Sequence, residues 1–226
     1  KQKELVRLAK AANKKVVLVL LEARPRIIHD IEPLCDAIVQ AYLPGDQGGI
    51  AIAELFSGKE DFSGHLPYTY PRYDGVIEFY DHPRSVDRSK SGDFSAYNPQ
   101  WDFGFGLSDN NGLIGKAKFE SKNEKDGNFT ISVTVSNPNQ KIVKTLVPVY
   151  LSDLYASTSP EGKRLIGFTK TTLNPGENKT LYFKFDANSL KRVAIDGKWR
   201  AEKGTFEINC GEGKLVFELE NDINFD

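Results

Sequence analysis

The first candidate chemical groups in the chain are Glu22 and Arg24, which come directly after the apolar run Val16 to Leu21. Such a run is typical of a buried strand, and open α/β sheets bind ligands beyond the carboxyl ends of their strands. Glu22 could therefore act as a general acid or base, and Arg24 could donate hydrogen bonds to ligand hydroxyl groups. The alternative is a loop carboxylate that pairs with Arg24 or Arg26. No second carboxylate can be placed opposite Glu22 from the sequence.

A second candidate pair is Ser63 and His65, whose spacing in an extended segment directs both side chains to the same side. No third partner or oxyanion-binding feature accompanies them, so the pattern does not favour a serine nucleophile. His29 and His82 stand apart from other metal-ligand residues. We therefore predict surface positions for these two histidines and no metal site.

Glycine and aromatic residues alternate near the middle of the chain, in the block WDFGFGLS at 101–108. Gly104 and Gly106 lack the third glycine and the strand-to-helix setting of a dinucleotide fingerprint. The sequence therefore predicts no dinucleotide cofactor here. Trp101, Phe103 and Phe105 are predicted to anchor the packing between two domains, with ring stacking on a ligand as the alternative.

The composition is that of a globular protein, with 30 Lys and Arg against 31 Asp and Glu and a net charge of −1. The absence of a basic stripe gives no case for nucleic acid binding. The longest apolar run, Val16 to Leu21, is far below the roughly 20 residues that span a bilayer, so no membrane contact is predicted. Cys35 and Cys210 fall in different predicted domains, which favours two free buried thiols over a disulfide.

Residues 1–80 are predicted to alternate between helix and strand. Apolar spacing predicts a helix over 3–13, with Leu5, Leu8, Ala9 and Ala12 along one face, and a strand buried on both faces follows over 16–21. A second helix is expected after Asp30, with an apolar face from Ile31 to Tyr42, and a third over about 47–56. One strand is too few for a parallel sheet, and the chain lacks Met and opens in a helical pattern. We therefore expect the other strands in an upstream part of a longer protein.

Residues 113–226 are predicted to form an all-β sandwich of about seven strands. Alternating apolar residues predict strands over about 129–135, 143–151, 165–171, 181–185, 206–210 and 215–219. Turns are expected over 174–177 and at Asp196-Gly197. This pattern is typical of an immunoglobulin or fibronectin type III-like sandwich. Residues 81–112 are assigned to a linker, with a charged loop over 81–97, followed by the aromatic-glycine block.

Four blocks of the sequence closely resemble glycoside hydrolase family 3. They are AYLPGDQGGIAIAELF at 41–56, SGHLPYTYP at 63–71, WDFGFGLS at 101–108, and the pair GF and LNPGE between 167 and 177. The last is similar to the fibronectin type III-like domain at the end of many β-glucosidases of this family. The chain departs from the family where Ala23 replaces the usual Gly of Gly-Arg-Pro and where Ser57 replaces the usual Gly of Phe-Gly-Asp.

The resemblance implies an α/β layered sandwich fragment followed by an all-β sandwich. It also implies a retaining glycosidase that acts on an oligosaccharide or β-glucoside without metal or cofactor, using a pair of carboxyl groups. Both would lie outside this chain: the nucleophile Asp in an upstream catalytic barrel, and the acid/base Glu before the first helix. The chain alone would then be inactive, with Glu22 and Arg24 at the rim of the active site.

The resemblance further implies that the barrel and the remainder of the sandwich domain are partners of this chain. It favours a periplasmic or secreted location and leaves a homo-oligomer open. The rival hypothesis is a non-catalytic carbohydrate-binding or adhesion β-sandwich module. That hypothesis explains the C-terminal half but does not explain residues 14–71, whose predicted buried strand and helices require a larger sheet.

Overall fold

The computed structural model describes residues 1–75, 98–107 and 112–225 of the chain. The described residues form two compact units. The first unit holds residues 1–60, 66–75 and 98–105, and the second holds residues 61–65, 106–107 and 112–225. The predicted loop 81–97, most of the predicted linker and His82 lie outside the described residues, so these predictions stay open.

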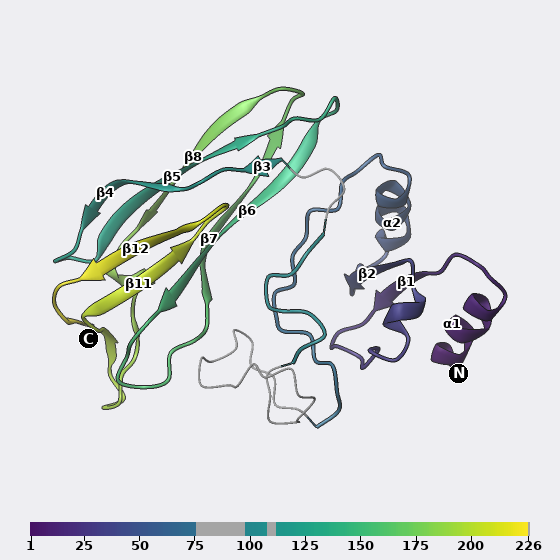
Figure 1. Cartoon of the computed structure of the whole chain (residues 1–226), viewed down its shortest axis with the longest axis horizontal. Coiled ribbons are helices and arrows are strands. Elements are labelled where there is room, and N and C mark those ends of the chain that lie inside the picture. Colours follow the sequence, from purple (N-terminus) through teal and green to yellow (C-terminus); the bar gives the residue numbers. More distant parts are fainter. Residues whose placement is uncertain (76–97, 108–111, 226) are drawn as a thin grey trace. The chain divides into compact units, whose positions relative to one another are not determined.

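The first unit opens with helix α1 (Gln2–Ala11), which is followed by strand β1 (Val17–Leu21) (Figure 1). Glu4 in the first turn of α1 and Lys10 in its last turn oppose the partial charges of the helix ends. The helix and the strand lie where they were predicted, but the buried face of α1 agrees only in part with the prediction. Val6 and Ala9 pack into the core of this unit, whereas the predicted face residues Leu5 and Leu8 are exposed.

The predicted second helix is wrong. The segment instead forms a short 3-10 helix η1 (Glu32–Leu34) and a second strand, β2 (Ala37–Tyr42), which pairs in parallel with β1. The residues Ile31 to Tyr42 fit a helical spacing, but the β-branched pair Ile38 and Val39 suits a strand once a partner is available. The parallel neighbour β1 supplies that partner, so tertiary pairing overrides the local pattern.

Asp36 sets the register of this parallel pair. Its backbone amide donates to the carbonyl of Val16, and its carboxylate accepts from the amide of Val16 at 2.9 Å and from Lys15 Nζ at 3.0 Å. The bond from the Val16 amide, and next the bond from Lys15, lower the pKa of Asp36 to about 2. The carboxylate is thus ionised at neutral pH and can hold both donors where the two strands begin.

Helix α2 (Gly48–Phe56) confirms the third predicted helix. A side chain at Gly48 would place its Cβ 2.6 Å from Pro44 Cγ, so the helix can begin close to Pro44 only with glycine there. Gly48 is the one buried residue of α2. The apolar residues Ile50 and Phe56 are exposed, so α2 contributes almost nothing to the core of the first unit.

Strand β1 was predicted to be buried on both faces, and the structure differs. Leu20 is buried, whereas Val17 and Leu21 are 51% and 63% exposed. Alternate residues of a strand point to opposite faces, so one face of β1 packs on the core and the other remains open. The exposed large apolar residues of the first unit are Leu5, Leu8, Val17, Leu21, Leu43, Ile50, Phe56 and Phe105.

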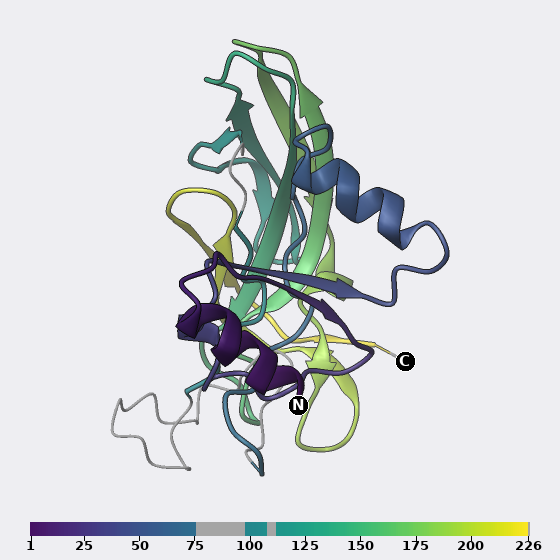
Figure 2. The ribbon, with the colours of Figure 1, turned by 90° about the vertical axis from the view of Figure 1, so that its right-hand side faces the viewer.

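The second unit is a sandwich of two four-stranded sheets (Figure 1). One sheet has the order β12-β11-β6-β7, from strands β6 (Val143–Asp153), β7 (Arg164–Leu173), β11 (Gly204–Asn209) and β12 (Lys214–Leu219). The other centres on β5 (Asn128–Ser136), with β8 (Asn178–Phe185) on one edge and β4 (Lys118–Asn123) and β3 (Leu113–Ile114) on the other. The long antiparallel pair β6 and β7 runs side by side (Figure 2).

A small three-stranded sheet completes the second unit. It has the order β13-β10-β9, from β9 (Arg192–Val193), β10 (Trp199–Ala201) and β13 (Ile223–Asn224). The 3-10 helix η2 (Ala187–Ser189) precedes it, and Asp186 caps η2 by accepting from the amide of Asn188. The two predicted turns are confirmed: residues 174–177 join β7 to β8, and Asp196-Gly197 lies in the turn between β9 and β10.

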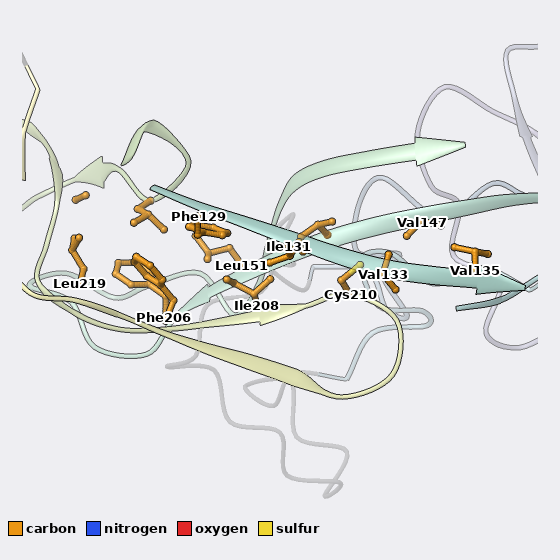
Figure 3. Close-up of a cluster of buried hydrophobic side chains, with 14 of the residues drawn as sticks. Phe129, Ile131, Val133, Val135, Val147, Leu151, Phe206, Ile208, Cys210 and Leu219 are labelled. Carbon is orange, nitrogen blue, oxygen red and sulfur yellow. The ribbon is translucent and has the colours of Figure 1, made fainter. Parts of the chain in front are cut away.

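The core of the second unit lies between its two sheets. Figure 3 shows side chains of β5 facing those of β11 and β12, with the sulfur of Cys210 among them. Both cysteines are free thiols, as predicted, although Cys35 is only half-buried. Burial raises the pKa of Cys210 to about 11, so this thiol stays protonated and acts as a small apolar group. No helix among the described residues is both long and apolar enough to span a bilayer.

The contribution of the core to the stability of the second unit can be tested at Phe217. We expect Phe217→Ala to lower the free energy of unfolding by about 3–5 kcal/mol, because this side chain is fully buried against Phe119 and Phe129. Val216→Ala is the matched control on the same strand: Val216 is half exposed, and its truncation should cost about 0.5 kcal/mol or less. Urea unfolding followed by circular dichroism measures both. Equal losses for the two variants would contradict the assigned core.

Candidate functional site

Glu22 lies directly after the carboxyl end of β1, where the sequence placed it. Its backbone amide donates to the carbonyl of Tyr42, at the end of β2, over 2.9 Å. Its side chain is 7% exposed, and Oε1 accepts a hydrogen bond of 2.9 Å from the hydroxyl of Tyr70. Neither Arg24 nor Arg26 forms an ion pair with it in the described part of the chain, so the predicted pairing is replaced by a neutral phenol donor.

Tyr70 is the fully buried residue of this site. Its hydroxyl lies 2.9 Å from Glu22 Oε1, 2.9 Å from the Arg26 carbonyl and 3.2 Å from the Arg26 amide. The hydroxyl accepts from that amide and has one proton to share between the two acceptors. Burial, and next the hydrogen bond to Glu22, raise the pKa of Tyr70, so the phenol keeps that proton at neutral pH.

Two more tyrosines and an amide surround this pair. The rings of Tyr42 and Tyr70 lie 6.3 Å and 6.1 Å from the ring of Tyr68, and Gln40 Nε2 donates weakly to the Tyr68 hydroxyl at 3.4 Å. Burial, and next electrostatic repulsion from Glu22 and from Tyr42 in its ionised form, raise the pKa of Tyr68 to about 12. We call these five residues, Glu22, Gln40, Tyr42, Tyr68 and Tyr70, the tyrosine cluster.

The tyrosine cluster offers acceptors and neutral hydroxyl donors but little cationic charge. The Oε1 atom of Gln40 is buried without a hydrogen-bond partner among the described residues. No group of three or more acidic, histidine or cysteine side chains in the described ranges is arranged to hold a metal ion. Such a set of groups can bind hydroxyl-rich ligands or hold a loop in place. On its own it is not the paired-carboxylate arrangement of a glycosidase.

Arg24 lies at the middle of the loop formed by residues 22–26 and is exposed. No hydrogen bond or ion pair ties its guanidinium to another residue that the structure describes. The Tyr70 hydroxyl binds the side chain of Glu22 at one end of this loop and the backbone of Arg26 at the other. Arg24 is therefore held at the apex of a loop that is anchored at both ends.

Residues 101–105 of the aromatic-glycine block pack against Tyr70 within the first unit. Tyr70 forms an isolated antiparallel bridge with Trp101, and their rings lie 5.0 Å apart. Trp101 stacks on Phe105 with ring centroids 6.1 Å apart, and Phe103 is 1% exposed. The amide of Gly104, whose φ is +80°, donates to the carbonyl of Leu66. These contacts show packing in the first unit, and the predicted role between domains stays a prediction.

The remaining candidates do not form a site. Ser63 is buried, and no hydrogen bond joins it to His65 in the described structure. Burial, and next the charge of Lys163, lower the pKa of His65. His29, expected at the surface, is half-buried, with its ring 5.0 Å from that of Tyr73. The sequence alone missed Gln40, Tyr42, Tyr68 and Tyr70, although the alternation of Tyr68 and Tyr70 between two prolines was a usable signal.

Two family models match the chain. The glycosyl hydrolase family 3 C-terminal domain matches residues 1–109, and the fibronectin type III-like domain matches residues 145–214. A periplasmic beta-glucosidase of Salmonella typhimurium is 35% identical over 221 residues, which is 93% of this chain and 29% of that protein. A lysosomal beta glucosidase of Dictyostelium discoideum is 36% identical, over 92% of this chain and 26% of that protein.

Solved structures of beta-glucosidases also match the chain along most of its length. A beta-glucosidase of Listeria innocua in complex with glucose matches 97% of this chain with a TM-score of 0.81 and 26% identity, and the match covers 32% of that protein. A beta-glucosidase of Erythrobacter marinus matches 96% of this chain with a TM-score of 0.81 and 30% identity, over 29% of that protein.

The chain thus spans about a third or less of these relatives. The α/β fragment and the β-sandwich that follows it are the predicted fold class, which is confirmed. Matches along both units, in sequence and in structure, place the chain in glycoside hydrolase family 3, of which it carries the C-terminal domain and the fibronectin type III-like domain.

Proposed function

We propose that the chain is the C-terminal part of a retaining β-glucosidase-type enzyme that acts on terminal β-linked glucosides. The observation that carries this proposal is the identity of 35–36% with two β-glucosidases along more than 90% of the chain. Two relatives named as β-xylosidases are 31–32% identical, so a related sugar is the second candidate substrate. The periplasmic and lysosomal names of the first two relatives favour a location outside the cytoplasm.

The nucleophile Asp and the acid/base Glu are proposed to lie outside this chain. In support, Glu22 is the buried acid of the candidate site, and it is engaged by a phenol rather than placed opposite a second carboxylate. A catalytic barrel and the rest of the sandwich domain would supply the missing pair. The exposed apolar residues of α1, β1 and α2 are the surface that the rest of the sandwich domain would cover.

Arg24 is proposed to contact the substrate at the rim of the active site. Its exposed guanidinium carries five donors, which suit the hydroxyl groups of a sugar. Glu22 and Tyr70 are then positioning residues, because their hydrogen bond and the bonds of Tyr70 to Arg26 fix the two ends of the Arg24 loop. We further propose that residues 1–80 are the end of the α/β sandwich domain, residues 81–112 are the linker, and residues 113–226 are the β-sandwich.

The placement of the catalytic pair can be tested by activity. We expect the 226-residue chain alone to hydrolyse a chromogenic β-glucoside at the background rate, and the protein that includes the upstream polypeptide to be active. Mixing the separate upstream polypeptide with the chain should restore turnover if the two parts associate. Turnover by the chain alone that Glu22→Gln abolishes would contradict the proposal and make Glu22 a catalytic residue.

The role of Arg24 can be tested in the active enzyme. We expect Arg24→Ala to raise KM about tenfold, which corresponds to the loss of about 1.4 kcal/mol from hydrogen bonds to a charged group. Arg26→Ala is the matched control, because it removes an exposed charge from the same loop and keeps the backbone groups that Tyr70 binds. Steady-state kinetics of both variants give the answer. An unchanged KM for Arg24→Ala would remove Arg24 from the substrate rim and leave the family assignment intact.

The positioning role of Tyr70 gives a separate prediction. Tyr70→Phe removes the hydroxyl that anchors both ends of the loop, so we expect KM to rise as it does for Arg24→Ala. The double variant should then show no more than the effect of Arg24→Ala alone, because both changes act on one interaction. Tyr182→Phe, at an exposed tyrosine, is the control for loss of a phenol hydroxyl. Additive changes of KM in the double variant would show that Tyr70 does not act through Arg24.

A further inference from the structure

The segment 154–163 joins β6 to β7 in the second unit, and polar groups from other segments hold it. Glu202 Oε2 accepts from the amide of Ser157 at 2.7 Å, and Ser152 Oγ donates to the carbonyl of Gly162 at 2.7 Å. Tyr155 is 76% exposed. The segment therefore lies at the surface, and hydrogen bonds fix it at Ser157 and at Gly162 near its end.

Arg192, from β9, holds the middle of this segment. Its Nη1 atom donates to the carbonyl of Thr158 at 3.1 Å, and its Nη2 atom donates to Thr158 Oγ1 at 2.7 Å and to the carbonyl of Ser159 at 2.9 Å. Arg192 is 8% exposed. Three hydrogen bonds from one buried guanidinium thus fix two successive residues of the segment.

Asp153, the last residue of β6, is buried beside this guanidinium. Its Oδ1 atom accepts from the amide of Tyr155 at 3.2 Å. Its Oδ2 atom lies 3.7 Å from Arg192 Nη1, too far for a hydrogen bond, and has no hydrogen-bond partner among the described residues. Asp153 and Arg192 are each 8% exposed. The carboxylate has therefore lost most of its hydration, and its hydrogen bonds within the protein do not fully replace those to water.

The other charged groups around Asp153 oppose its ionisation. Burial raises its pKa to about 6, because the attraction of Arg192 and the bond from the Tyr155 amide do not offset the loss of water. Glu202, in the turn before β11, and Glu161, in the segment itself, add repulsion to an ionised carboxylate. Asp153 thus changes charge just below neutral pH.

We propose that Asp153 and Arg192 form a clasp that holds the segment 154–163 more tightly in mild acid than at neutral pH. When the segment lifts away, Asp153 meets water and its pKa returns toward about 3.9. The closed state therefore binds the proton more strongly than the open state, and protonation favours closure. The bonds from Arg192 to Thr158 and Ser159 do not need the carboxylate, so they persist when Asp153 becomes neutral.

Hydrogen exchange tests the clasp directly. We expect the hydrogen-bonded amides of Leu154, Tyr155 and Ser157 to open about tenfold less often at pH 5 than at pH 7, after correction for the intrinsic exchange rate, with a plateau above pH 7. Asp153→Asn should keep the segment closed at both pH values and abolish the dependence on pH, because the amide is neutral throughout. Asp196→Asn is the matched control: hydrogen bonding to the Lys198 amide lowers the pKa of Asp196, and its removal should leave the dependence unchanged.

A second variant separates the clasp from its protonation. Arg192→Lys cannot make the forked bonds to Thr158 and Ser159, so protection of the segment should fall at both pH values while core amides of β5 and β6 keep theirs. The proposal is overturned by protection that does not depend on pH in the unaltered protein. It is also overturned by an undiminished pH dependence in Asp153→Asn, or by full protection in Arg192→Lys.

Discussion

The arrangement of segments in the first unit depends on one constraint: the buried hydroxyl of Tyr70 needs hydrogen-bond partners. Tyr70 is fully buried, and a phenol taken out of water without partners costs about 1–3 kcal/mol. Its partners are Glu22 and the backbone of Arg26, 48 and 44 residues away in the chain. Satisfying them joins the extended segment 66–71 to the carboxyl end of β1. The bridge to Trp101 then brings the aromatic-glycine block to the same place.

The β1–β2 pair shows why part of the fold escaped prediction. Residues 31–42 carry apolar side chains at helical spacing, and a period is a local property of the sequence. The segment forms a strand because it pairs with β1 and because the carboxylate of Asp36 accepts a hydrogen bond from the amide of Val16. A parallel neighbour is a nonlocal partner, so the sequence pattern of the segment does not contain it.

The second unit was predicted more closely because its signal is local. Along β5 and β8 apolar side chains that face the core alternate with polar ones, and the polar side is mostly less buried, although Ser132 on β5 is buried as well. Turns with asparagine, proline and glycine mark where those strands end. The short strands β3, β9, β10 and β13 have only two or three residues each, too few to show a period, and the sequence did not reveal them.

The two buried acids, Glu22 and Asp153, explain why the position of a site could be predicted but its chemistry could not. They are equally buried, at 7% and 8% exposure, yet Glu22 accepts a hydrogen bond from a neutral phenol, while one oxygen of Asp153 faces a guanidinium at 3.7 Å without a bond. The strand pattern predicted the place of Glu22, because a strand end is a local feature. The side chain that faces each acid, Tyr70 for Glu22 and Arg192 for Asp153, comes from a distant segment of the chain, and burial strengthens its effect on the acid. An acid in the sequence is therefore only a candidate, and the fold assigns its role by the partner it brings to that acid.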